Sequence, residues 1–200
     1  MRTVLRSDDP DVNPYQLMTA LVVPRPIAWI STLSGHGIGN LAPHSFFSVA
    51  CANPPIVSFT SVGHKDTLRN GLATGEFVVN LTNLPLLDHV NSSSAAFGPE
   101  VDEAAALDLP MEASAHVRPP RVAGSPASIE CTLHSTQELG DSTLVLGSVV
   151  AFTVDDAVMV DGHPEFALLQ PVARLGKEEW ALPGEVISTP RPSSPEDIGR

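Results

Sequence analysis

The chain has 200 residues, 42% of them apolar, which is enough for one domain with a sizeable core. Its formal net charge of −12 argues against nucleic acid or an anionic membrane surface as a partner, because both need a basic surface. The first ten residues lack the apolar core of a signal peptide, and no apolar run has transmembrane length. We therefore expect a cytoplasmic protein.

The order of apolar and polar residues predicts a mainly β protein with short peripheral helices. It lacks the regular strand–helix alternation of a doubly wound parallel sheet. The glycines at 35–39 do not have dinucleotide-fingerprint spacing and no helix follows, so we interpret them as a hairpin turn. Strands are expected over 20–33, 56–62, 77–81, 127–136, 142–155 and 157–160, and helices over 15–20, 67–74, 85–93 and 102–107.

A first polar cluster lies at the end of an apolar strand. Residues 27–30 are apolar, and Ser31 and Thr32 follow them. Their hydroxyls can bind phosphate oxygens, or they can simply cap the end of the strand. Arg25, just before the run, would supply a positive charge for a phosphate. An acidic chain needs such a charge locally to bind an anion.

A second cluster occupies residues 40–48, which are too rich in proline and serine for a regular strand throughout. Its backbone N–H and C=O groups could meet the polar edge of a ring system, with Phe46 or Phe47 packed nearby. For each phenylalanine alone, a place in the core is the competing interpretation.

The third cluster begins a helix. Asp66 or Thr67 is a suitable N-cap, and Gly75 is a suitable end. Free N–H groups at such a start attract phosphate, and Lys65 adds a full positive charge beside them. The alternative is an ordinary capped surface helix with a solvated lysine. Together, the three clusters suit a flat, aromatic, phosphorylated ligand, for which flavin mononucleotide (FMN) is the obvious candidate.

These segments resemble the flavin reductase-like family, which includes flavoredoxins and the reductase components of two-component monooxygenases. The similarity covers about residues 10–190, so it concerns the whole domain. The matching motifs are PRPIAWIST from Pro24, NLAPHSFF from Asn40, NPP from Asn53, KDTLRN from Lys65, TGEFVVN from Thr74, RPPRV from Arg118, Glu130-Cys131, LVLGSVV from Leu144 and PVARLG from Pro171.

The resemblance implies an FMN-binding split β-barrel of Greek-key type, acting as a homodimer with the flavin in a cleft at the subunit interface. It puts Arg174 at the open face of the ring, or else in a structural salt bridge. It assigns no catalytic residue. The implied cofactor contacts are Ser31 and Thr32 near the phosphate or ribityl chain, Lys65, Asp66 and Thr67 at the phosphate, and Asn40, Leu41, Ala42, Ser45 and Phe46 along the isoalloxazine.

The implied activity is NAD(P)H-dependent flavin reduction that supplies a partner oxygenase, with NAD(P)H as a transient co-substrate. Many flavin reductases of this group carry a histidine in the turn that here reads Gly140-Asp141-Ser142-Thr143. Its absence keeps two alternatives open: a flavoredoxin-like electron carrier, or a flavin-binding scaffold without redox chemistry.

The domain is expected to span residues 13–182, after an N-terminal arm over 1–12. A Pro/Ser-rich tail over 183–200 would be disordered by composition, although the family resemblance suggests that it packs on the partner subunit as far as about Pro192. Residues 94–126 are interpreted as a long excursion over the barrel, serving as a lid or a dimer contact.

Neither the two cysteines nor the seven histidines have metal-type spacing, so we expect no metal site. Cys51 and Cys131 are predicted to be two buried apolar thiols rather than a disulfide.

Overall fold

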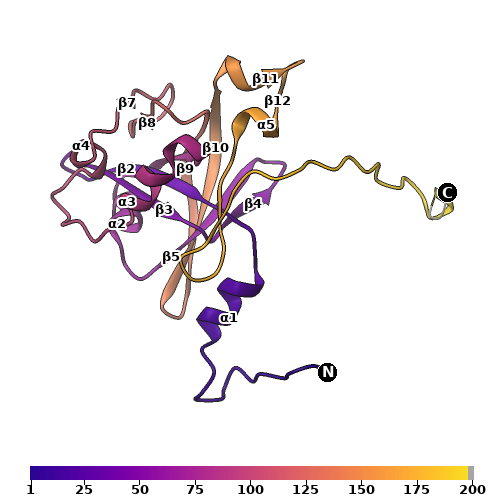
Figure 1. Ribbon diagram of the computed structural model, residues 1–200. Helices are drawn as coiled ribbons and strands as arrows, with labels where there is room; N and C mark the ends of the chain where they lie inside the picture. The colour runs from indigo at the N-terminus through magenta and orange to yellow at the C-terminus, as the bar shows by residue number, and fades with distance from the viewer. Residues whose placement is uncertain (198–200) are drawn as a thin grey trace.

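The computed structural model describes residues 1–197. A seven-stranded antiparallel sheet forms its centre, in the order β3-β2-β6-β9-β10-β5-β4. The long β9–β10 hairpin runs through the middle of the molecule (Figure 1). The strands are β2 (Ala28–Leu33), β3 (Gly39–His44), β4 (Phe47–Cys51), β5 (Ile56–Val62), β6 (Glu76–Leu81), β9 (Ala127–Leu139) and β10 (Ser142–Val154).

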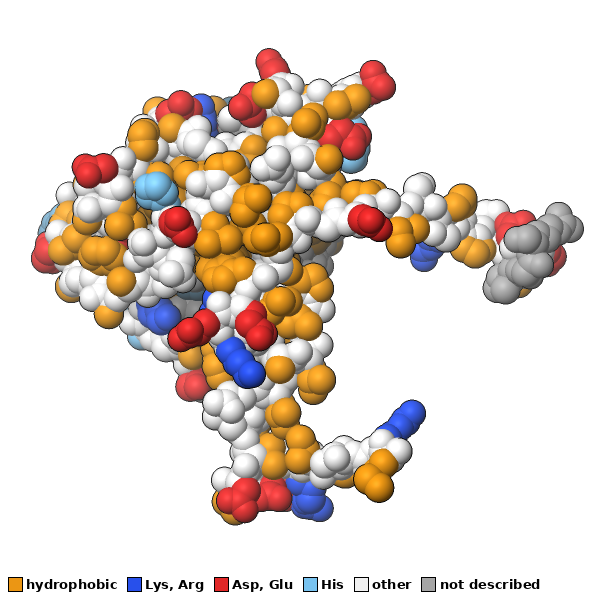
Figure 2. All heavy atoms as spheres, in the orientation of Figure 1, with side chains coloured by type: hydrophobic (Ala, Val, Ile, Leu, Met, Phe, Trp, Pro, Cys, Tyr) orange, Lys and Arg blue, Asp and Glu red, His pale blue; other side chains and the backbone are white. Residues whose placement is uncertain are grey.

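Smaller elements surround this sheet. Helices α2, α3 and α4 each lie near the β2–β3 edge of the sheet, whereas α1 and the described parts of both terminal segments project away from the body (Figures 1 and 2). The helices are α1 (Pro14–Leu21), α2 (Asp66–Thr74), α3 (Leu87–Ser92), α4 (Glu103–Ala106) and α5 (Phe166–Leu169), with 3₁₀ turns η1 (Leu84–Leu86), η2 (Asp156–Val158) and η3 (Pro195–Asp197). The short strands are β1 (Arg25–Pro26), β7 (Met111–Glu112), β8 (Arg121–Val122), β11 (Met159–Val160), β12 (His163–Pro164), β13 (Ala173–Arg174) and β14 (Trp180–Ala181).

Strand β2 is apolar throughout its first half because both of its faces are buried. Ala28 and Ile30 enter one core cluster, which also holds Phe77 of β6 and Leu68 of α2. Trp29 enters a second cluster, to which α3, α4 and β3 also contribute. The two clusters hold the helices against opposite faces of the sheet near its β3 edge.

The mainly β architecture with short peripheral helices is confirmed, as is the hairpin turn between β2 and β3. In that turn the N–H of Ser34 donates to the carbonyl of Ile38 over 2.8 Å. The strands expected over 56–62 and 77–81 agree with β5 and β6 to within one residue.

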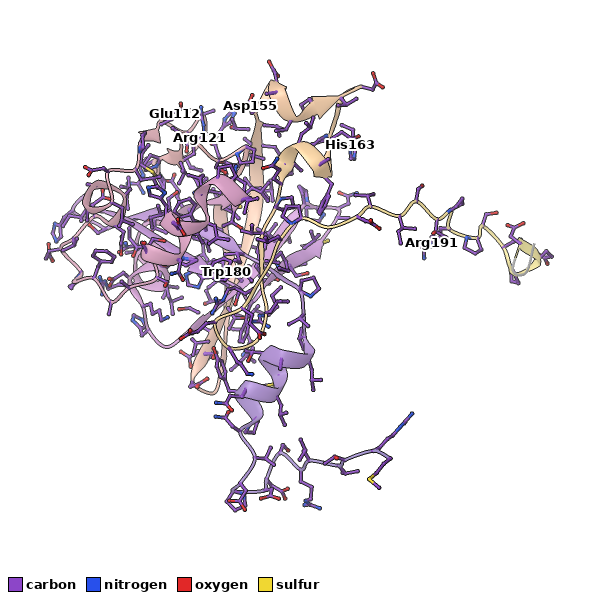
Figure 3. All side chains as sticks on the ribbon, in the orientation of Figure 1. Glu112, Arg121, Asp155, His163, Trp180 and Arg191 are labelled. Carbon is purple, nitrogen blue, oxygen red and sulfur yellow. The ribbon has the colours of Figure 1, made fainter. Side chains whose placement is uncertain are left out.

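The strand expected over 20–33 is wrong in its first part. Helix α1 extends to Leu21, and strand pairing begins only at Arg25, because Pro24 has no N–H to donate to a ladder. Of the strand expected over 157–160, the first two residues lie in the turn η2, which is capped by Asp155 (labelled in Figure 3), and the last two form β11.

Residues 40–48 are strand for most of their length, with a break between β3 and β4. Pro43 is tolerated within β3 because β3 is an edge strand that pairs only with β2. The excursion over 94–126 contains α4, β7 and β8. It is fastened to the sheet by Glu130, whose carboxylate accepts from the N–H groups of Ala115 and His116 over 2.9 and 2.6 Å.

Both cysteines are free thiols. Cys131 is buried as expected, and burial raises its thiol pKa to about 12. Cys51, expected to be buried, is only half-buried because it ends the edge strand β4. Over residues 1–197, no helix is both long and apolar enough to span a membrane, and no three side chains of the metal-binding types come together. The tail prediction extends past Asp197 and falls partly outside the described residues.

Candidate functional site

A groove follows the outer edge of β3. It comprises a cavity of about 300 Å³ toward α2, one of about 270 Å³ toward α1, and a smaller one of about 130 Å³ toward β13 and β14. All three share Pro43, and neighbouring pairs also share His44, Ser45, Lys65 or Ser94. A site of this extent suits a ligand of nucleotide size.

A buried polar cluster fixes α2 to the sheet at one end of this groove. The side-chain amide of Asn40 donates to the hydroxyls of Thr32 and Thr67 over 3.2 and 3.1 Å. The amide of Asn70 donates to the same Thr32 hydroxyl over 3.2 Å. Because these bonds join β2, β3 and α2, they hold the start of the helix beside the β3 edge.

Helix α2 begins with Lys65 as its N-cap, so the expected cap at Asp66 or Thr67 is wrong. Asp66 instead forms an ion pair with Arg69 one turn later. Lys65 makes no side-chain capping bond, and the N–H groups of the first turn have no intrahelical acceptor. This end of the groove therefore presents free N–H groups and an exposed lysine to a ligand. The helix ends at Gly75 in the left-handed conformation, as expected.

His44 lines the middle of the groove and is 7% exposed. Its ring lies 5.0 Å from that of Phe59, and its Nε2 has no hydrogen-bond partner within the described protein. Burial, together with the positive charge of Lys65, lowers the pKa of His44 to about 4. The imidazole is thus neutral at pH 7, and its buried polar nitrogen is a group that a bound ligand could satisfy.

This pKa predicts a pH-dependent stability that replacement of His44 removes. Between its ordinary pKa of 6.5 and about 4, the unfolded histidine is protonated and the folded one is not. Lowering the pH through this window should therefore lower the free energy of unfolding by about 1.4 kcal/mol per unit. The His44→Phe variant keeps a ring against Phe59 but should lack this part of the slope. Urea unfolding at pH 7 and 4.5 measures the difference, and parallel profiles for the two proteins would contradict it.

A short helix and a loop form the other wall of the groove. The Glu103 carboxylate at the start of α4 accepts from the N–H of Leu41 over 2.9 Å, which satisfies an outward-facing donor of the β3 edge. Burial raises the pKa of this carboxyl. The indole of Trp29 donates to the hydroxyl of Ser93 over 2.8 Å, and so fixes the loop that carries Ser94 and Phe97.

The structure gathers most of the expected cofactor contacts in the groove but leaves some outside it. Asn40, Ala42, Lys65, Asp66 and Thr67 line the cavity next to α2. Ser45 and Phe46 line the cavity next to α1, and Ser45 also borders the smallest cavity with Arg174.

The side chains of Arg25, Ser31, Thr32 and Leu41 face the protein instead. Arg25 donates to the carbonyls of Thr19, Val22 and Leu175, and Ser31 donates to the carbonyl of Pro120. Leu41 is 1% exposed within the second core cluster. A ligand could contact these four positions only through the main chain, so their proposed contacts remain predictions.

Sequence reasoning missed several groove residues. His44 was present in a recognised motif, and its position between Pro43 and Ser45 was the available signal. Asn91, Ser94, Phe97 and Trp180 come from segments without distinctive periodicity, and only long-range packing brings them to the β3 edge.

The fold and the groove define a split β-barrel protein with a site that presents an exposed lysine and free helix N–H groups to an anionic group. Residues 19–166 match the sequence model of the flavin reductase like domain. The chain belongs to this flavin reductase-like family. The family predicted from its motifs is thereby confirmed, as is the split-barrel fold.

Known proteins resemble the chain over nearly its whole length. An uncharacterized protein of Aquifex aeolicus is 34% identical over 182 residues, which cover 88% of this chain and 92% of that protein. Nitrilotriacetate monooxygenase component B from Bacillus cereus has a similar structure, with a TM-score of 0.87 at 28% identity over 94% of this chain and 98% of that one. The 2-nitrobenzoate 2-nitroreductase of Pseudomonas fluorescens gives 0.88 at 26% identity, over 96% and 97% of the two chains.

Proposed function

We propose that the protein is an FMN-binding oxidoreductase that reduces flavin with NAD(P)H. The observation that carries this proposal is the start of α2, where the N-cap residue Lys65 makes no side-chain capping bond, at the end of a groove along β3. These groups would hold the phosphate, while the main chain over 42–46 and the unpartnered Nε2 of His44 would meet the ring. Bound FMN would supply the redox chemistry, by accepting a hydride and passing electrons on.

The protein's own contribution would be binding and orientation. Lys65 and the helix start would fix one end of the ligand, and neutral His44 would add an uncharged hydrogen-bonding group in the middle. The likeness to a monooxygenase component B supports a flavin-dependent oxygenase as the physiological partner.

Titration with FMN, followed by rapid mixing with NADH or NADPH, tests the proposal. We expect a bound-flavin spectrum that bleaches on mixing with one of the two dinucleotides. Failure of FMN to bind at high micromolar concentration would remove the redox hypothesis.

A flavoredoxin-like electron carrier is the second candidate, and one observation favours it. The turn at 140–143, which lacks the histidine of many flavin reductases, is the tip of the β9–β10 hairpin. The carbonyl of Asp141 there accepts from the N–H of Gly63 over 2.9 Å, two residues before Lys65. The turn thus lies next to the groove, where a missing histidine would matter. Tight FMN binding without bleaching by NAD(P)H would favour the carrier, and absence of FMN binding would favour a scaffold.

We further propose a homodimer, because the groove is open along the β3 edge and closed two-fold symmetry is the commonest arrangement of identical subunits. The expected mass in light scattering is twice the chain mass of 21.1 kDa. A monomer mass with FMN bound would overturn the cleft at the subunit interface.

A further inference from the structure

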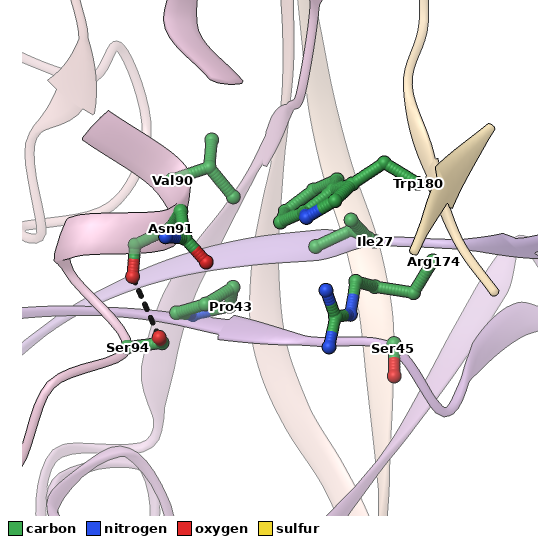
Figure 4. A pocket seen from close by; sticks show the side chains of 8 residues that line it. All are labelled: Ile27, Pro43, Ser45, Val90, Asn91, Ser94, Arg174 and Trp180. Atoms are coloured by element: carbon green, nitrogen blue, oxygen red, sulfur yellow. Dashed lines mark hydrogen bonds between the residues drawn. The ribbon is translucent and has the colours of Figure 1, made fainter. Parts of the chain in front are cut away.

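The smallest cavity of the groove has walls unlike the rest. Figure 4 shows Ile27, Pro43 and Val90 around it, with the indole of Trp180 above and the guanidinium of Arg174 directed inward. Its volume is about 130 Å³. An apolar cavity of roughly 150 Å³ in another protein takes up benzene, so a single aromatic ring is a reasonable limit here.

Arg174 brings a positive charge to this cavity without a matching carboxylate. One of its N–H groups donates to the carbonyl of Lys177 over 3.0 Å, and its Cζ lies 4.9 Å from the centre of the Trp180 ring. Within residues 1–197, no Asp or Glu forms an ion pair with it. Stacking and the Lys177 bond fix the guanidinium but leave donors free for a ligand.

A second guanidinium lies close behind. Arg25 is 7% exposed, it too forms no ion pair among the described residues, and its Nε reaches the hydroxyl of Ser45 at the cavity wall over 3.5 Å. Burial and the nearby charge of Arg174 both lower the pKa of Arg25. The N–H groups of Arg25 are engaged by main-chain carbonyls, so Arg25 adds positive charge behind the cavity while Arg174 offers the free N–H groups to an anion, in a chain of net charge −12.

We propose that this cavity binds a small aromatic carboxylate of single-ring size, with the carboxylate on Arg174 and the ring against Ile27, Pro43 and Val90. The proposal rests on the proposed function in one respect: Pro43, Ser45 and Ser94 are shared with the rest of the groove, so such a ligand would lie next to the flavin. It deepens that function by naming the chemical class of a compound that would approach the cofactor there.

The test uses benzoate as the probe, with neutral benzamide and inorganic phosphate for comparison, at constant ionic strength. Tryptophan fluorescence reports on the cavity without FMN, because the other tryptophan, Trp29, is fully buried and bonded to Ser93. The FMN spectrum reports on it after loading. The variant is Arg174→Gln, and Arg118→Gln removes the same charge from an exposed side chain outside the groove.

We expect benzoate to bind the wild-type protein and Arg118→Gln equally, and Arg174→Gln at least about tenfold more weakly, because a charge-assisted bond is lost. Benzamide and phosphate should bind at least about tenfold more weakly than benzoate. No fluorescence response to benzoate, equal binding by Arg174→Gln, or binding of phosphate as tight as that of benzoate would each overturn the proposal. Loss of FMN binding alone would refute the proposed function and leave the fluorescence result to decide the cavity.

Discussion

Replacement of Phe77 with alanine is expected to lower the free energy of unfolding by about 3–5 kcal/mol, as is usual when a large core aromatic is truncated. Phe77 is 1% exposed, and its ring meets that of Phe59 edge to face with centroids 5.5 Å apart. Gly147 leaves room for the ring, since a Cβ there would lie 2.3 Å from the Phe77 Cζ. The site is thus shaped around this side chain and has little means of closing over the void.

Phe152 provides a matched control on the same sheet. Its side chain is 65% exposed, so Phe152→Ala should change the unfolding energy by about 0.5 kcal/mol or less in the isolated subunit. Urea denaturation of both variants measures the contrast. Equal losses would contradict the central role of the Phe77 cluster, and a concentration-dependent loss for Phe152→Ala would place that residue at a subunit contact.

The Phe77 cluster also bears on the site, because Leu68 of α2 belongs to it and Phe59 contacts His44. Packing of the core cluster therefore supports the residues that line the groove. A partly destabilised Phe77 variant that remains folded should bind FMN more weakly, since α2 would be held less firmly at the β3 edge.

Much of the fold could be predicted from the sequence because the central strands have local signals. Residues 56–62 are rich in β-branched and aromatic side chains, and 77–81 are continuously apolar up to Asn80. Prediction failed where a proline or a polar cap interrupts an apolar run. Pro24 has no N–H for a strand ladder, so pairing begins only at Arg25, and the side chain of Asp155 caps the turn η2.

The candidate site was predictable only in part, for the same physical reason. The motifs named Asn40, Lys65 and Thr67, and these residues line one cavity because they lie at the ends of neighbouring elements. They could not show that Ser31 and Arg25 point into the protein, because their hydrogen-bond acceptors are distant in sequence. Ser31 donates to the carbonyl of Pro120, and Arg25 donates to the carbonyl of Leu175, 150 residues away. Nor could they show Trp180 beside Arg174, which depends on the pairing of β13 with β14.

Replacement of Lys65 with alanine should weaken FMN binding roughly tenfold to a hundredfold, because a charge-assisted hydrogen bond to an ionised group contributes on the order of 1.5–3 kcal/mol. Lys65 is exposed, makes no side-chain cap and stands beside the free N–H groups of α2. Riboflavin lacks the phosphate, so its binding should hardly change. Titration of both ligands against the wild-type protein and the variant measures how much more FMN binding is weakened than riboflavin binding. A general disturbance of the fold would weaken both equally.

The matched control is Arg69→Ala, which removes a positive charge from the same helix. Arg69 is already paired with Asp66, so its loss should change FMN binding less than threefold, in keeping with the small contribution of exposed ion pairs. If Arg69→Ala weakened FMN binding strongly and riboflavin binding little, and Lys65→Ala had no such effect, the phosphate would bind near Arg69 instead.

If Lys65→Ala weakened the binding of FMN and riboflavin equally, Lys65 would have a structural role rather than a phosphate contact. Arg25 could not then replace it, because its N–H groups are engaged by main-chain carbonyls and the hydroxyl of Ser45. The phosphate would have to bind on the N–H groups of α2 alone.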